Sequence, residues 1–208
     1  MGLRELKKQQ MRERIAETAW RMFGERGFER VTVVDVARAT GVSEATVFNY
    51  FPSKEDLFYS RLESFGERLV EAVRGRPPGE SALVAFRRQL LATGGLLTRV
   101  ASGDADALAR LRTVNRVIAD SPALRAREQR AFTDCAQALA EALAEEPGTP
   151  YDDFTALVAA YALVGVHRAL VDHVRRRVLA DDEPASLAAE LRQLADQAFG
   201  LLEEGLRG

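Results

Sequence analysis

Apolar residues recur at helical spacing in almost every segment of the chain, and no segment keeps the alternation of a β-strand. Between Gln9 and Glu25, for example, apolar side chains fall at positions i, i+4, i+7 and i+8 from Ile15. An amphipathic helix with one buried face has this spacing. The pattern therefore predicts an all-α protein.

Local capping signals predict three helices after the first one. Thr32, followed three residues later by Asp35, has the arrangement of a capping box. Ser43 is the next candidate N-cap, and the short helix that it begins ends before a proline. Ser53 then caps a fourth helix, which we expect to run as far as Val73.

The stretch RGRPPGES, residues 74–81, interrupts the helical pattern and separates two parts of the chain. We expect one domain over residues 1–55 and a helical bundle over residues 56–208. Within the bundle, helical segments are predicted at 81–101, 104–120, 122–146, 150–180 and 184–206. Residues 156–171 are apolar nearly all round, so this helix must be covered on more than one side. The last helix has a stripe formed by Leu187, Leu191, Leu194, Ala198 and Leu201.

Composition restricts the compartment more than the function. The 208 residues are 47% hydrophobic and carry a net charge of −2, so bulk charge does not indicate nucleic acid. Neither an apolar run long enough to span a membrane nor the apolar core of a signal peptide is present, and Cys135 is the single cysteine. These features predict a cytoplasmic chain without a membrane partner. The first fourteen residues form a basic arm, which could contact DNA or be disordered without it.

Candidates for catalysis or metal binding are weak. His167 and His173 are six residues apart, which places them about 600° around a helix and on different sides of it. Zinc-binding pairs prefer a separation of four residues, and the chain has no phosphate-binding glycine loop or nucleophile elbow. We therefore expect no metal, no cofactor and no enzymatic activity.

The segment from Thr32 to Phe51 has the pattern of a helix-turn-helix, with its tight turn at Gly41. Such a unit lays its second helix in the major groove of DNA. Val47 and Phe51 are four residues apart and face the scaffold, but a two-turn helix cannot also bury all of its other bulky side chains. Some of these side chains must be presented to a partner.

Residues 15–58 then resemble the DNA-binding domain of the TetR family of bacterial transcriptional regulators. The resemblance rests on the GFE turn, the Thr32 cap, the GVS turn, the YF pair and the restart at Lys54. It implies backbone contacts through Thr32, Thr46, Tyr50 and Lys54. It also implies that Ser43, Glu44, Ala45 and Asn49 approach bases or phosphates.

Several of these assignments have an alternative. Thr32 and Ser43 could act only as helix caps. Glu44 could accept a hydrogen bond from a cytosine amino group or simply complement the dipole of its helix. Phe48 stands where family members often have tyrosine, so it can offer DNA an apolar contact but no hydroxyl.

For the second part of the chain, the family resemblance implies a homodimer through the last two helices and a pocket for a hydrophobic or amphipathic ligand. An acyl thioester, a drug-like aromatic molecule or a polyketide would qualify. The candidate lining residues are Leu97, Leu111, Asn115, Phe132, Phe154, Tyr161 and Gly165. The predicted function is a ligand-released repressor of a pseudo-palindromic DNA operator. The alternatives are an activator, or a helical ligand-binding or interaction protein without operator release.

Overall fold

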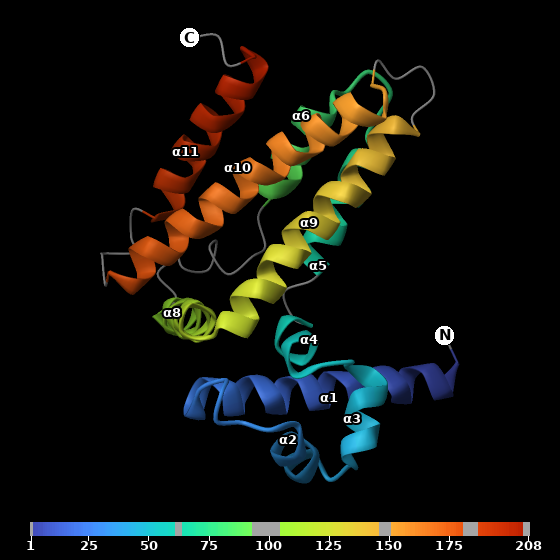
Figure 1. Cartoon of the computed structure of the whole chain (residues 1–208), viewed down its shortest axis with the longest axis vertical. Coiled ribbons are helices and arrows are strands. Elements are labelled where there is room, and N and C mark those ends of the chain that lie inside the picture. The colour runs from blue at the N-terminus through green and yellow to red at the C-terminus, as the bar shows by residue number, and fades with distance from the viewer. Residues whose placement is uncertain (1, 61–63, 93–104, 146–150, 181–186, 206–208) are drawn as a thin grey trace. The chain divides into compact units, whose positions relative to one another are not determined.

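The computed structural model describes residues 2–60, 64–92, 105–145, 151–180 and 187–205 (Figure 1). These residues form helices and their connections, without a strand, which confirms the all-α prediction. The helices are α1 (Leu3–Arg26), α2 (Val33–Thr40), α3 (Glu44–Tyr50), α4 (Lys54–Tyr59), α5 (Ser64–Arg74), α6 (Ala82–Leu90), α8 (Ala105–Asp120), α9 (Pro122–Ala144), α10 (Asp153–Leu179) and α11 (Leu187–Glu203).

The chain divides into two compact units. The first unit comprises residues 1–64 together with 116–127, and the second comprises 65–115 and 128–208. The first unit thus includes all of α4 and gains the end of α8 and the beginning of α9. A sequence pattern could not reveal this addition, because residues 116–127 are distant in the chain from the helices they join.

In the first unit, α1 packs against α2 and α4, and α2 packs against α3. The aromatic rings of Phe23, Phe28 and Phe58 meet in its core with centroid separations of 5.1 to 5.9 Å. The ring of Trp20 stacks on that of Phe58 at 5.2 Å, and its Nε1 donates to the Phe58 carbonyl at 2.8 Å. Aromatic packing of this kind fixes α4 against α1.

The basic N-terminal arm is part of α1, which begins at Leu3 rather than near Gln9. Two of its arginines contact the helix-turn-helix. The Arg12 guanidinium lies 5.1 Å from the centre of the Phe51 ring, and Arg14 donates to the Thr40 carbonyl at 2.7 Å. Because Thr40 is the last residue of α2, Arg14 satisfies a carbonyl that the helix leaves open.

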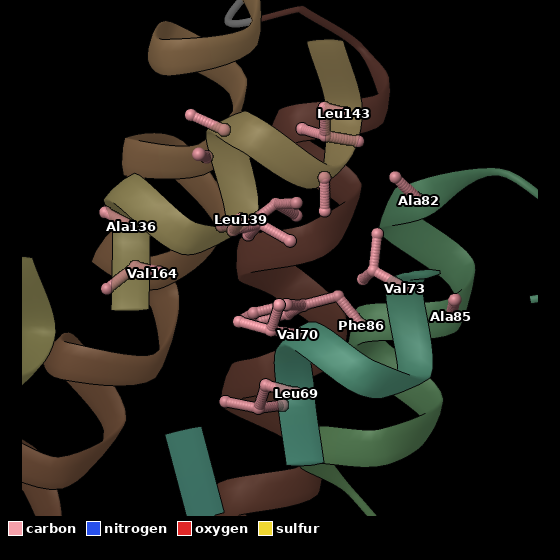
Figure 2. Packing of buried hydrophobic residues seen from close by; sticks show 14 of the residues in the cluster. Leu69, Val70, Val73, Ala82, Ala85, Phe86, Ala136, Leu139, Leu143 and Val164 are labelled. Carbon is pink, nitrogen blue, oxygen red and sulfur yellow. The ribbon is translucent and has the colours of Figure 1, made fainter. Parts of the chain in front are cut away.

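The core of the second unit contains apolar residues from α5, α6, α9, α10 and α11. In Figure 2, Leu69, Val70 and Phe86 lie on one side of this cluster and Val164 lies beside Ala136 on the other, with Leu139 between them. The Phe86 ring also meets the Phe199 ring edge-on at 6.3 Å. A smaller cluster joins α8 to α10 and α11. Each helical segment predicted after residue 81 corresponds to a helix, although α6 ends at Leu90 and residues 91 and 92 of the predicted segment 81–101 are not helical.

The predicted fourth helix does not run unbroken to Val73. The fourth helix ends at Tyr59, and α5 begins at Ser64, with residues 61–63 outside the described part of the chain. The apolar helix predicted at 150–180 is α10, which by length and composition alone could cross a membrane. Buried helices of water-soluble proteins meet the same criterion, and Ala156, Ala160 and Leu163 of α10 lie in the second unit's core.

Candidate DNA-binding surface

Helix α3 is held on one side and open on the other. Val47 and Phe51 are almost completely buried, as the sequence predicted. By contrast, Glu44, Ala45 and Asn49 are exposed, and the Phe48 side chain is 43% exposed. The helix therefore presents a surface that the unit's own packing does not use.

Hydroxyl groups fix the beginnings of α2 and α3. Thr32 and Asp35 form a complete capping box: the Thr32 hydroxyl accepts from the Asp35 backbone N–H at 3.1 Å, and the Asp35 carboxylate accepts from the Thr32 backbone N–H at 3.0 Å. The Thr32 hydroxyl also donates to the Asp35 carboxylate at 2.6 Å. These bonds lower the pKa of Asp35. At the start of α3, the Ser43 hydroxyl accepts from the Thr46 N–H at 3.1 Å and lies 2.7 Å from the Thr46 hydroxyl. Both predicted caps are confirmed, and any phosphate contact would use groups that already serve the helices.

Lys54 and Tyr50 lie at the edge of the same unit and are half-buried. The Lys54 ammonium donates to the Phe28 carbonyl at 3.1 Å and lies 4.1 Å from the centre of the Phe28 ring. An ammonium has three donors, so one such bond leaves capacity for a phosphate. Lys54 thus ties α4 to the GFE turn in the structure, and its role on DNA stays a prediction.

A second connection to α4 involves residues that the sequence analysis did not identify. Asp56 accepts from the Ser53 hydroxyl at 2.7 Å and from Arg127 Nε at 2.8 Å. The Tyr59 hydroxyl donates to the Leu124 carbonyl at 3.1 Å. Arg127 and Leu124 belong to the start of α9, more than 60 positions away in the chain. The Ser53–Asp56 cap was recognisable in the sequence, but its partner Arg127 had no local signal.

The candidate ligand-binding residues separate into three groups. Leu97 lies outside the described residues. Leu111 and Asn115 are buried in the second unit, and the Asn115 amide donates to the Leu111 carbonyl of its own helix at 2.9 Å. Phe132 is half-buried and packs against the larger core cluster.

Three of the predicted lining residues, Phe154, Tyr161 and Gly165, are exposed rather than in the interior. The Phe154 side chain is 72% exposed, and Tyr161 and Gly165 are also exposed. With Val158, they follow one another at four-, three- and four-residue steps along one face of α10. Because the helix is apolar on several sides, its sequence pattern does not distinguish the buried faces from the exposed one. We call residues 154, 157, 158, 161 and 165 the α10 face.

Polar groups inside the second unit form two paired clusters. Arg175 donates to Glu128 at 2.6 Å, and both side chains are largely buried. Glu190 of α11 accepts from Arg177 at 2.8 Å and lies 3.0 Å from His173. These pairs join α10 to α9 and α11. The Nδ1 of His167 is also buried without a hydrogen-bond partner, as is the Nε of Arg175.

A capped recognition helix with an open outer side, set on a three-helix scaffold, defines a helix-turn-helix DNA-binding protein. The sequence profile described as "Bacterial regulatory proteins, tetR family" matches residues 15–60, and the profile of the MftR C-terminal domain matches residues 90–207. The chain belongs to the TetR family of bacterial transcriptional regulators.

Individual relatives agree with this assignment. The chain is 29% identical to the HTH-type transcriptional regulator TcmR of Streptomyces glaucescens over 73% of this chain and 67% of TcmR. It is 26% identical to the putative mycofactocin biosynthesis transcriptional regulator MftR of Mycobacterium tuberculosis over 92% of this chain and 89% of that protein. These relatives are named as regulators, in line with the prediction that the chain is not an enzyme.

The fold is also found in solved structures. The crystal structure of native NalD, the secondary repressor of the MexAB-OprM multidrug efflux pump in Pseudomonas aeruginosa, superposes with a TM-score of 0.54. The superposition covers 91% of this chain and 97% of NalD at 22% identity. This likeness concerns the fold alone.

Proposed function

We propose that this regulator is a repressor that binds a pseudo-palindromic operator as a homodimer and leaves it when a hydrophobic small molecule binds the second unit. The observation that carries the proposal is the open outer side of α3. Its N-terminal residues, Ser43 to Thr46, are those that a helix-turn-helix places against base edges and phosphates. Asn49 and Phe48 extend the same surface by one turn.

The proposed DNA contacts are of two kinds: contacts to phosphates, which position the protein, and contacts to base edges, which read the sequence. Thr32, Thr46, Tyr50 and Lys54 carry hydroxyl, N–H or ammonium groups that suit phosphate oxygens, and such contacts fix register without selecting sequence. Asn49 can pair with an adenine edge, and Phe48 can meet a thymine methyl group. Glu44 and Ala45 complete the surface at the start of α3.

The α10 face supports a homodimer. Phe154, Leu157, Val158 and Tyr161 are exposed apolar side chains on one helix of the second unit, and Leu201 of α11 is exposed as well. Apolar groups gathered in this way characterise protein interfaces. In the proposed dimer, α10 and α11 of each subunit meet their copies. Two recognition helices would then lie about 34–36 Å apart, or a multiple of that, along the DNA.

Release is proposed to pass through α8 and α9, because both helices have residues in each compact unit. A ligand that shifts these helices in the second unit would displace Leu124 and Arg127, which hold α4 through Tyr59 and Asp56. The half-site spacing would then no longer match the operator. The loss of DNA affinity is limited by the difference in ligand affinity between the two states.

The ligand is proposed to be hydrophobic or amphipathic, since apolar side chains dominate the interior of the second unit. Phe132, Leu111 and Asn115 remain its candidate contacts. DNA-binding regulators of this kind act in the cytoplasm, which is where we place this chain.

The test is fluorescence anisotropy with DNA from the region upstream of the protein's own gene. We expect tight, salt-sensitive binding that exceeds binding to scrambled DNA of the same length. Asn49→Ala is expected to weaken binding to the upstream DNA about tenfold, with a smaller effect on scrambled DNA, because one base contact is worth about 1–3 kcal/mol.

Gln137→Ala is the matched control, because Gln137 is an exposed residue of α9 in the second unit. It should leave both affinities unchanged. Equal affinity of the wild-type protein for upstream and scrambled DNA would sink the repressor proposal. Transcription that requires the protein, in a reporter driven by the same DNA, would instead identify an activator.

A further inference from the structure

His167 lies near the middle of α10 and is enclosed by two aromatic rings. The centroid of the Phe65 ring, on α5, is 5.1 Å from that of the imidazole, and the centroid of the Phe132 ring, on α9, is 5.3 Å from it. The Phe132 ring meets the imidazole edge-on. His167 therefore sits where three helices of the second unit meet.

The Nδ1 atom of His167 is buried and lacks a hydrogen-bond partner. A polar atom removed from water without a partner is unfavourable, so native proteins seldom leave one without a reason. The other histidine of the same helix illustrates the ordinary outcome, since His173 meets Glu190 at 3.0 Å. Burial also lowers the pKa of His167 to about 4, which keeps its ring neutral near pH 7.

We propose that His167 Nδ1 is the polar anchor of the ligand in the second unit, and that the ligand is an uncharged aromatic molecule carrying a hydroxyl group. This inference deepens the proposed ligand response and rests on it. A hydroxyl can both donate and accept, so it can pair with Nδ1 in either tautomer of the imidazole. Phe65 and Phe132 offer ring faces and edges to an aromatic body.

An uncharged ligand fits this place better than an ion. A neutral imidazole cannot balance a buried charge, and the nearest ring partners of His167 are apolar. Arg68 is a charged residue close to this place, with its guanidinium carbon 5.6 Å from the centre of the Phe65 ring, but its side chain is exposed to solvent.

Access to Nδ1 requires one of the enclosing rings to turn aside. Both Phe65 and Phe132 are only half-buried, so the ring that turns aside moves toward solvent and gives up contacts with the larger core cluster. The ligand's own ring then replaces the displaced contact while its hydroxyl satisfies Nδ1. Phe132 was predicted as a lining residue from the sequence, whereas His167 was considered there only as a metal ligand.

The test compares β-naphthol with β-methylnaphthalene, two probes of nearly the same shape that differ in a hydroxyl and a methyl group. Their affinities are measured by calorimetry for the wild-type protein and for His167→Phe, which keeps an aromatic ring between Phe65 and Phe132. We expect the preference of the wild-type protein for β-naphthol to fall roughly tenfold in the variant, the effect of one buried hydrogen bond.

NMR of ring-labelled histidine gives a second readout, because the chain contains just two histidines. The Nδ1 signal of His167 should move when β-naphthol is added, and the signals of His173, assigned with His173→Gln, should stay in place. Equal selectivity in the wild-type protein and His167→Phe, an unmoved His167 signal, or failure of both probes to bind at millimolar concentration would each overturn the inference.

DNA binding measured without a probe separates this inference from the proposed function. Selective operator binding together with failed probe selectivity would reject the His167 anchor and leave the regulator intact. Loss of selective operator binding with the probe selectivity preserved would reject the repressor proposal and leave a ligand site at His167.

Discussion

The two compact units satisfy their polar and apolar groups in different ways. In the first unit, side chains reach backbone groups at defined points: Arg14 bonds the Thr40 carbonyl, Lys54 that of Phe28, and Tyr59 that of Leu124. The second unit is built from longer apolar helices. It leaves the α10 face exposed and the Nδ1 of His167 unpaired.

This difference indicates where each unit needs a partner. In the first unit the outer side of α3 is exposed, and its exposed groups are small or polar apart from Phe48. The described part of the second unit has the exposed α10 face, which a protein surface would cover, and the buried Nδ1 of His167, which a small molecule could satisfy. Substitutions in each unit can test this contrast.

Val158→Asp should separate the proposed dimer. A carboxylate placed in an apolar interface without a partner is expected to cost about 3–5 kcal/mol, which raises the dimer dissociation constant more than a hundredfold. Sedimentation velocity across a range of concentrations measures this change. Gln137→Asp adds the same charge at an exposed position of α9 and should behave as wild type. If both variants sediment alike, the α10 face is not the dimer interface.

Lowering the pH should reduce the unfolding free energy through His167, in the interior of the second unit. Because the folded pKa of His167, about 4, lies below its ordinary value of 6.5, the unfolded chain takes up the proton first as the pH falls. This residue's contribution to stability is complete above pH 6.5 and is lost as the pH falls toward 4. The loss amounts to about 3 kcal/mol of unfolding free energy.

Urea denaturation at several pH values measures that loss. His167→Phe should remove it and give a flatter dependence on pH. His173→Gln leaves His167 unchanged, so this variant should keep the loss of unfolding free energy that comes from His167. A wild-type slope that persists unchanged in His167→Phe would place the acid sensitivity elsewhere in the chain.

Much of the first unit could be predicted from the sequence because its determinants are local. The caps at Thr32, Ser43 and Ser53 each bond a residue three positions ahead, so the sequence alone contains both partners. The burial of Val47 and Phe51 follows from their four-residue separation. Local chemistry of this kind determines where α2, α3 and α4 begin.

What could not be predicted depends on contacts between distant segments. Arg127 meets Asp56 across 71 positions, and nothing near either residue indicates the pairing. The helical period of α10 was predicted correctly, but its exposed face was not. Apolar residues lie on several sides of this helix, so the sequence does not show which face is exposed. Phe154 and Tyr161 were therefore assigned to the interior.

Arg127→Gln tests the long-range connection in the first unit. It removes the partly buried ion pair with Asp56 and retains the cap that Asp56 forms with Ser53. We expect the unfolding free energy to fall by about 1–2 kcal/mol, the typical effect of a charged hydrogen bond that is only partly screened. Arg125→Gln changes an exposed arginine on the same turn of α9 and should have little effect. Equal stability of the two variants would show that the pair contributes nothing measurable.

The smallest expected effect belongs to Phe48, the one large apolar side chain exposed on α3. Phe48→Tyr adds a hydroxyl that can donate to a phosphate, so affinity for operator and scrambled DNA should rise together, about threefold. The salt dependence should stay the same, since a neutral hydroxyl releases no counterion. Anisotropy titrations at several salt concentrations measure both quantities. If Phe48 instead packs on a thymine methyl group, Phe48→Tyr would change affinity for the operator alone, and the residue would contribute to sequence selection rather than positioning.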